Sequence, residues 1–363
     1  MTHKDIILNA IAGHHTPRNA AAIMSGGLWS FTRQGLTLRE ALGNAPRAAE
    51  VICTTAEEIG SDMIYTATGF YQLLPRALGA EIKFRPNGVP DVVAPVFPDL
   101  SALDPGRLDR IAADDGMQFL WDTNRRVVSG IGARYLVATG MFGPLTVSGH
   151  LRSVEQVIRA KSKEPQTPQT ALDLACEACW RYIKPFLDSG SVLASLADPT
   201  ASGDMISRAS FAEFVAPRLQ RLVRNIHGAG GLVMLHICGD VNDRLDLMRD
   251  TGADVLSVDF KVELRRARAT LAGQTAFAGN LDPVRVMLHA DAKEVYRLAC
   301  EAILNHRHDG NYILMPGCDI PPQTPLENVK ALFRAAADIG SAPDFRTSSE
   351  AHAAIQTHQT QTS

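Results

Sequence analysis

The sequence has little of what marks several large classes of protein, and each shortage excludes one of them. Only six of the 363 residues are cysteine, too few at this length for a disulfide framework. Lysine and arginine number 36 against 39 aspartates and glutamates, a net charge of -3, so no basic field favours nucleic acid. No apolar run reaches the ~18 residues of a membrane span, and residues 1–13 lack a signal-peptide pattern. These absences predict a cytoplasmic protein with reduced thiols and neither a nucleic-acid nor a membrane partner.

What the chain does have is a repeating alternation of strand and helix signals. Hydrophobic residues make up 45% of the sequence, enough for a large core. Eight apolar segments are predicted as strands, and helical stretches follow most of them. They are residues 20–24, 62–66, 135–139, 192–196, 232–238, 253–259, 275–280 and 312–315. Alternating strands and helices favour a parallel sheet, and eight such units favour an α/β fold of the (β/α)8 TIM-barrel type. A doubly wound open sheet is the alternative, but no early strand is followed by Gly-x-Gly-x-x-Gly.

The remaining segments predict additions to one barrel domain that spans residues 1–340. Residues 1–18 indicate an N-terminal helical extension, and Asn87-Gly88 between apolar runs is a turn signal for an inserted β-hairpin. Thr37 and Glu40 form a capping-box pattern at the start of a helical stretch that reaches about Gly60. Further helices are expected at 101–130, 210–227 and 326–340, loops at 140–144 and 161–168, and a disordered C-terminal tail at 341–363.

The segment Gly230–Asp240, GGLVMLHICGD, carries the strongest chemical signal. His236 and Cys238 are two residues apart at the end of a predicted strand, so their side chains point to the same face. Imidazole and thiolate can take two corners of a tetrahedral zinc site. Cys318 follows the last predicted strand, and barrel strands converge at their carboxyl ends. The alternative is that His236 is a satisfied polar group and that the cysteines are small core residues.

Two further polar residues end neighbouring predicted strands and complete the candidate site. Asp259 is either the fourth metal ligand or a helix cap, and Asn280, with Asp282 nearby, ends the next strand. We therefore expect Asp259 and Asn280 to act in catalysis, and Asp259 also to bind the metal.

Other candidates carry weaker signals. Cys176 and Cys179 have CxxC spacing but lie in a helical stretch without a second pair, which favours a core position. Asp198 and Asp204 either contact the substrate or cap a helix, and Phe142 with Pro144 is expected as an apolar wall of the pocket. The histidines at 14, 15, 306 and 308 are expected to be solvated.

Four segments resemble a known family. LHICGD (235–240), TGADVLSVDF (251–260), AGNLDPV (278–284) and MPGCDIPPQTPLENVKAL (315–332) are similar to the uroporphyrinogen decarboxylase superfamily. They most resemble its zinc-containing branch, the corrinoid-dependent methyltransferases that include methylcobamide:coenzyme M methyltransferases. The likeness runs from about Gly35 to Gly340 and is strongest in the C-terminal half.

The resemblance implies a zinc ion bound by His236, Cys238 and Cys318, which match that branch's His-x-Cys…Cys motif. Asp259 falls where the branch has its acidic fourth ligand, although the family pattern has glutamate there. The implied activity is transfer of a methyl group between a corrinoid (cobalamin) and a small-molecule thiol or methyl donor. The chain contains no Asp-x-His-x-x-Gly motif for cobalt, so a separate corrinoid-binding protein is the expected partner.

Two alternatives remain beside the zinc methyltransferase. Decarboxylation of uroporphyrinogen needs no metal, but the decarboxylases carry an N-terminal segment with two arginines, whereas this chain has only Arg33-Gln34-Gly35. They also lack the His-x-Cys pair. The other alternative is a zinc-stabilised subunit without chemistry of its own.

Overall fold

Eight parallel strands form a nearly closed barrel, as the sequence predicts. The computed structural model describes residues 1–24, 27–86, 88–159, 166–271, 273–306 and 310–341. The barrel strands are β1 (Ala20–Ala21), β2 (Met63–Tyr65), β5 (Leu136–Phe142), β6 (Leu193–Ala197), β7 (Leu232–Ile237), β8 (Val255–Val258), β9 (Ala276–Leu281) and β10 (Tyr312–Pro316). Their hydrogen-bonded order is β1-β10-β9-β8-β7-β6-β5-β2, and all seven pairings are parallel. Every strand therefore delivers its carboxyl end to the same mouth.

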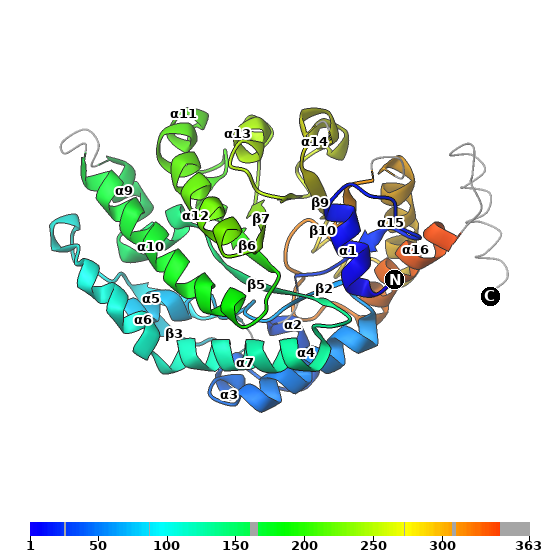
Figure 1. Cartoon of the computed structure of the whole chain (residues 1–363), viewed down its shortest axis with the longest axis horizontal. Coiled ribbons are helices and arrows are strands. Elements are labelled where there is room, and N and C mark those ends of the chain that lie inside the picture. The colour runs from blue at the N-terminus through cyan, green and yellow to red at the C-terminus, as the bar shows by residue number, and fades with distance from the viewer. Residues whose placement is uncertain (25–26, 87, 160–165, 272, 307–309, 342–363) are drawn as a thin grey trace.

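Helices surround this barrel (Figure 1). They are α1 (His3–Ile11), α2 (Leu28–Arg33), α3 (Leu38–Ala41), α4 (Ala45–Ile59), α5 (Leu73–Leu78), α6 (Arg110–Ala113), α7 (Asp115–Ile131), α8 (Pro144–Leu151), α9 (Val154–Arg159), α10 (Gln166–Asp188), α11 (Arg208–Ser210), α12 (Ala216–Gly228), α13 (Leu245–Arg249), α14 (Leu264–Leu271), α15 (Ala292–His306) and α16 (Leu326–Ser341). Figure 1 places α11, α13 and α14 along the top edge, with α4 and α7 near the bottom. None of the described helices is long and apolar enough to cross a membrane.

The core has two layers because successive strand side chains point to opposite faces. Met234 and Val255 belong to a buried cluster inside the barrel, whereas Leu235 and Leu256 belong to the larger cluster between strands and helices. Helix α1 packs against β1, β5 and β10 and adds Ile6 and Ile7 to the inner cluster. The predicted N-terminal extension is therefore part of the barrel's own core.

Asp62 closes the seam between the first two strands. Its backbone N–H donates to the carbonyl oxygen of Ala21 over 2.9 Å. Its fully buried carboxylate accepts from the Ala21 N–H and pairs with Arg18 at 2.6 Å. His3 of α1 adds a contact of 2.7 Å to the same carboxylate. One side chain thus joins the two end strands and the helix that packs against the barrel.

Several predicted strand boundaries were wrong. The first strand has only two residues rather than five. The predicted loop at 140–144 is instead strand up to Phe142, and Pro144 is the first residue of α8. Proline suits the first helical position because its missing N–H would have no partner there.

Two predicted helices are interrupted. The capping box of Thr37 and Glu40 is present, but its helix ends at Ala41 and α4 starts at Ala45, with Gly43 at a φ of +87° between them. The helix expected at 210–227 contains a π-helical turn at Phe211–Val215 before α12. Pro217 lacks a backbone N–H, so the regular α-helical bond cannot form at that point.

The inserted hairpin is confirmed, with β3 (Glu81–Lys83) antiparallel to β4 (Asp91–Ala94). Its expected turn includes Asn87, which lies outside the described residues, as do 161–165 of the predicted connection and 342–363 of the predicted tail. The last three residues of that predicted connection, 166–168, are instead the start of α10. Within the 101–130 region, two short 3₁₀ turns, Leu100–Ala102 and Pro105–Asp109, precede α6 and α7.

We expect Asp62→Ala to lower the free energy of unfolding by about 2–3 kcal/mol. Removing one partner of a largely buried ion pair leaves the other charge without compensation, and Arg18 is still 19% exposed, which softens the effect. Urea unfolding followed by circular dichroism measures the change. Asp122→Ala, at an exposed pair on α7, is the matched control and should cost well under 1 kcal/mol.

Candidate metal centre

Strand β7 places His236 at the barrel mouth. His236 lies two residues after the inward-pointing Met234 and is itself buried. It pairs in register with Ser257 of β8. Cys238 follows one residue past the strand, and Gly239 then turns the chain with a φ of +91°. The predicted strand and its alternation therefore account for the first two members of the site.

Cys318 reaches the same point from β10. The residue before it, Gly317, donates its backbone N–H to Leu281 O over 2.7 Å. A side chain at this position would meet the backbone nitrogen of Phe260, only 2.5 Å from the expected Cβ. Glycine therefore permits the close approach of the β8 and β10 ends that brings Cys318 to Cys238.

The three ligand atoms lie together in a geometry suited to a metal ion. The sulfurs of Cys238 and Cys318 are 3.5 Å apart, and Nε2 of His236 is 3.0 Å from the Cys238 sulfur. Tetrahedral zinc with Zn–S bonds of about 2.3 Å would separate two thiolates by about 3.8 Å. The ligand atoms of these three side chains all lie within 4.8 Å of one another. No other group of three or more His, Cys, Asp or Glu side chains in the described part of the chain is placed to hold a metal ion.

The other ring nitrogen of His236 fixes which atom faces the sulfurs. Nδ1 lies 3.2 Å from the carbonyl oxygen of Ser257 and 3.1 Å from its hydroxyl. A carbonyl only accepts, so Nδ1 carries the proton and Nε2 keeps its lone pair for the cluster. Metal-binding histidines are commonly oriented in this way.

The two thiols share a hydrogen bond, and it separates their acidities. The contact with Cys318 lowers the pKa of Cys238. The contact with Cys238, together with burial, raises the pKa of Cys318. Cys238 is therefore the thiol that ionises first, whereas a bound dication would stabilise both as thiolates.

Asp259 lies beside the cluster with both carboxylate oxygens engaged. One accepts the backbone N–H of Gly239 over 3.0 Å, and the other accepts that of Lys261 over 3.0 Å. The residue is almost fully buried. These bonds tie the turn after Cys238 to the end of β8.

Asn280 supports the same loop from the next strand. Its amide nitrogen donates to the carbonyl oxygens of Asp259 and Val262 over 3.0 and 2.6 Å. Asp282, the other polar residue near this strand end, accepts from the backbone N–H groups of Val284 and Arg285. Polar side chains thus hold the loops around the three ligand atoms.

An aromatic wall flanks the mouth on the β2 and β5 side, and the sequence predicts only part of it. The ring of half-buried Phe142 lies 5.0 Å from that of Tyr71 and 5.4 Å from that of His150. Burial, together with the charge of Asp319, raises the pKa of Tyr71. Tyr71 was missed because it lies in a loop with no periodic pattern; its position shortly after a barrel strand was the available signal.

The weaker candidates have different structural roles, and none of them lies among the three ligand atoms. Asp198 is buried and accepts from the backbone N–H groups of Leu145 and Thr146, so it caps α8 from a neighbouring strand end. Asp204 is exposed and pairs with Lys261 at 3.1 Å. Cys176 and Cys179 are buried core residues, as expected.

One expectation about the histidines was wrong. His14 and His15 are exposed, as predicted, but His306 is buried, with its ring 5.3 Å from Phe277 and 4.9 Å from Tyr312. It ends α15 and packs onto the outer barrel layer. His308 lies outside the described residues.

The fold and these ligand atoms define a (β/α)8 barrel with a candidate metal centre at its mouth. The chain belongs to the uroporphyrinogen decarboxylase (URO-D) family, whose model matches residues 2–339.

Its relatives include both methyltransferases and decarboxylases. The chain is 32% identical over 270 residues to methylcobamide:CoM methyltransferase MtaA of Methanosarcina barkeri, which covers 72% of this chain and 76% of that protein. A methyltransferase structure from Methanosarcina mazei superposes with a TM-score of 0.83 at 28% identity, covering 93% and 99% of the two chains. Uroporphyrinogen decarboxylase of Thermus thermophilus is 26% identical over 340 residues, 90% of this chain and 95% of that one. These matches confirm the expected family and the expected class of enzyme, a methyltransferase.

The burial of His150 in the aromatic wall can be tested by the pH dependence of stability. Burial lowers its pKa to about 4, and Nδ1 has no hydrogen-bond partner among the described residues. As pH falls from about 6.5 to 4, His150 binds a proton in the unfolded chain but stays neutral in the folded chain. The free energy of unfolding should therefore fall, relative to His150→Gln, by up to about 3 kcal/mol, or about 1.4 kcal/mol per pH unit. Urea unfolding of both proteins across this range measures the difference, and parallel pH curves would contradict the assignment.

Proposed function

We propose that the chain is a zinc-dependent methyltransferase. It moves a methyl group between a corrinoid carried by another protein and a small-molecule thiol or methyl donor. The observation that carries the proposal is the meeting of His236 Nε2 and the sulfurs of Cys238 and Cys318 within 4.8 Å at the barrel mouth. The nitrogen and sulfur donors suit zinc, and three protein ligands leave a position for substrate.

The relatives support the choice of reaction. The name of the matched Methanosarcina barkeri protein states that it transfers a methyl group from methylcobamide to CoM. The present chain contains no Asp-x-His-x-x-Gly motif for cobalt, which supports a corrinoid delivered on a separate protein. CoM, a thiol, is accordingly our first candidate acceptor.

The chain's own residues prepare the site for a thiol. Bound zinc would supply a Lewis acid that favours the thiolate form of a coordinated sulfur. Ser257 keeps the proton of His236 on Nδ1, which leaves Nε2 free to bind. Asn280 holds the Asp259–Val262 turn, and we assign it to the positioning of this loop in the reaction.

We further propose Asp259 as the fourth ligand, replaced by substrate during turnover. To reach the metal, its carboxylate would exchange one of its two backbone hydrogen bonds. A carboxylate oxygen bound to zinc in this way would be readily displaced by the softer sulfur of a thiol substrate.

We expect Cys318→Ser to lose zinc and methyl transfer while the barrel stays folded. Loss of a residue that only orients a ligand weakens metal binding by up to about 100-fold. Loss of Cys318, a direct ligand, should therefore weaken zinc binding by more than that. Elemental analysis measures zinc per chain, and transfer from free methylcobalamin to CoM measures activity. Cys53→Ser, at a half-buried cysteine outside the cluster, is the control and should retain both. Full zinc and activity in Cys318→Ser would refute the metal site.

Cobalt substitution tests Asp259 separately. The visible bands of bound Co²⁺ report its ligand set and geometry, so Asp259→Ala should shift or weaken them. Asp319→Ala, at an exposed carboxylate next to Cys318, should leave them unchanged. An unaltered spectrum in Asp259→Ala would show that Asp259 does not bind the metal and only holds the neighbouring loop.

A further inference from the structure

Exposed apolar side chains gather around the mouth. Large hydrophobic residues with high exposure in the described part of the chain are Met1, Val89, Val93, Met205, Phe260 and Val284. Three of them follow strand ends at the mouth: Met205 after β6, Phe260 after β8 and Val284 after β9. Their exposed fractions are 62%, 44% and 49%. Single exposed apolar residues need no explanation, but a group beside a functional site suggests a binding surface.

Phe260 and Val284 adjoin one hollow beside the metal centre. Phe260, Arg265, Asn280 and Arg285 line a cavity of about 600 Å³ between the β8 and β9 ends and helices α14 and α15. Its lining also includes the acidic side chains of Glu263, Asp282 and Glu301. Val284 immediately precedes Arg285. We call Phe260, Arg265, Val284 and Arg285 the rim patch. Its link to the metal centre is direct, because Asn280 also holds the Asp259 loop.

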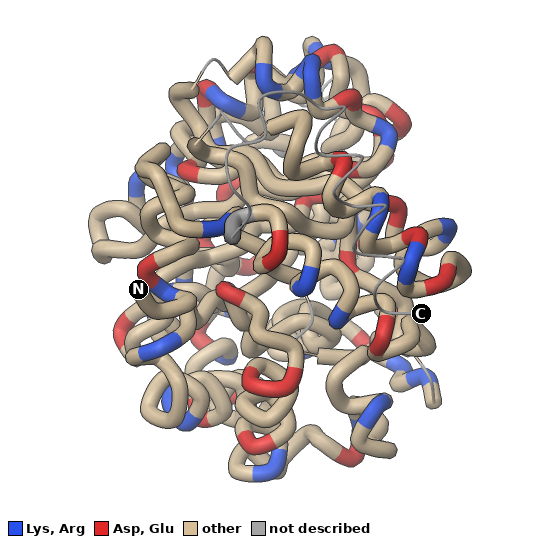
Figure 2. The backbone as a smooth tube through the Cα atoms, turned by 90° about the vertical axis from the view of Figure 1, so that its right-hand side faces the viewer, with Lys and Arg blue, Asp and Glu red and all other residues tan. Residues whose placement is uncertain are grey.

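Helix α14 gives this surface a positive charge. Arg265 and Arg266 are exposed, and neither forms an ion pair with any described residue. Arg285 is 79% exposed and only loosely paired, 3.8 Å from Asp282. Figure 2 shows basic residues interspersed with acidic ones at the top of the molecule, the edge where Figure 1 places α14.

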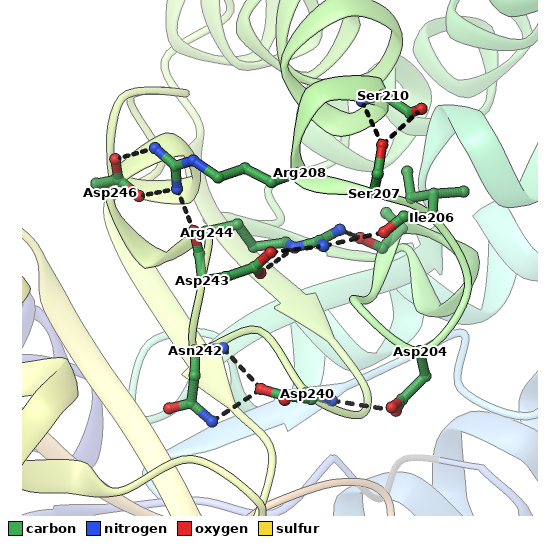
Figure 3. Close-up of polar contacts among 11 residues, drawn as sticks. Asp204, Ile206, Ser207, Arg208, Ser210, Asp240, Asn242, Asp243, Arg244 and Asp246 are labelled. Atoms are coloured by element: carbon green, nitrogen blue, oxygen red, sulfur yellow. Dashed lines mark hydrogen bonds and ion pairs between the residues drawn. The ribbon is translucent and has the colours of Figure 1, made fainter.

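The neighbouring side of the rim is internally compensated. Arg208 pairs with Asp246 at 2.5 Å and Arg244 with Asp243 at 2.8 Å, and Figure 3 shows these contacts among the β6 and β7 loops. Lys261 is paired with Asp204. On the α14 side, Glu301 is paired with Arg297. The three arginines 265, 266 and 285 outnumber the two remaining acids, Glu263 and Asp282, so this side keeps an excess of positive charge next to the exposed apolar residues.

We propose that the rim patch binds an acidic face of the corrinoid-carrying protein. The inference rests on the proposed function, because methyl transfer requires a protein-bound corrinoid to approach the mouth. Apolar anchors ringed by arginine are typical of the energetic centre of a protein interface. Opposite charge on the partner would speed its approach and set its orientation.

The test compares two methyl donors in the full-length, zinc-loaded enzyme with CoM as acceptor. One donor is free methylcobalamin; the other is the methylated corrinoid protein purified from Methanosarcina barkeri. The variant is Arg265→Glu with Arg285→Glu. We expect KM for the protein donor to rise at least about tenfold, with a weaker dependence on salt. Its kcat and the rate with free methylcobalamin should stay unchanged.

Arg125→Glu with Arg126→Glu on α7 is the matched control. It makes the same change of charge on exposed arginines, and Arg125 has an aspartate three residues before it, as Arg285 has. This variant should behave as the wild type with both donors. Val284→Asp tests the apolar part and should raise KM for the protein donor alone.

Several results would overturn the proposal. One is a rim variant whose KM for the protein donor equals that of the wild type. Others are an equal loss of rate with both donors, or the same rise in KM in the α7 control. A wild type that accepts methyl only from free methylcobalamin would also overturn it. Absence of transfer from free methylcobalamin by the wild type would instead refute the proposed function itself, so the two failures are distinguishable.

Discussion

The molecule depends on closing eight parallel strands into a ring, and the closure is completed at Asp62. A sheet with open ends would leave unpaired backbone groups at β1 and β2. Here the backbone of Asp62 bonds to Ala21, while its carboxylate binds Arg18 and the Ala21 N–H. Because the ring is nearly closed, inward-pointing side chains from different strands converge. The meeting of His236 with Cys318, from strands separated by two others, follows from that convergence.

The loops at the mouth form a second level of organisation above the ring. Gly317 lets the β10 end lie against Phe260, Asp259 binds the turn after Cys238, and Asn280 binds the turn after Asp259. The loops after β7 and β8 are therefore each held by a side chain from the end of the next strand. Such support from neighbouring strands holds the loops that carry the donor atoms.

The sequence predicts much of this arrangement because the relevant patterns are periodic. Alternation along β7 places His236 and Cys238 on one face, and the count of eight strands brings Cys318 to the same end. It cannot predict that both oxygens of Asp259 accept backbone N–H groups, since that depends on the positions of Gly239 and Lys261. The burial of His306 was not predicted, because a polar residue near a helix end is ordinarily solvated. Here the rings of Phe277 and Tyr312 pack against it. Tyr71 and His150 lie in segments whose role depends on which strand end they approach, and no local pattern encodes that.

The position of the donors along the chain has a consequence for biogenesis. The two cysteines are 80 residues apart, and strands β8 and β9 lie between the strands that carry them. A chain emerging from the ribosome therefore cannot assemble the full donor set until the last barrel strand has been made and docked. An ion that needs all three donors would therefore bind only after the C-terminal half has folded, so its content would report on the folding of that half.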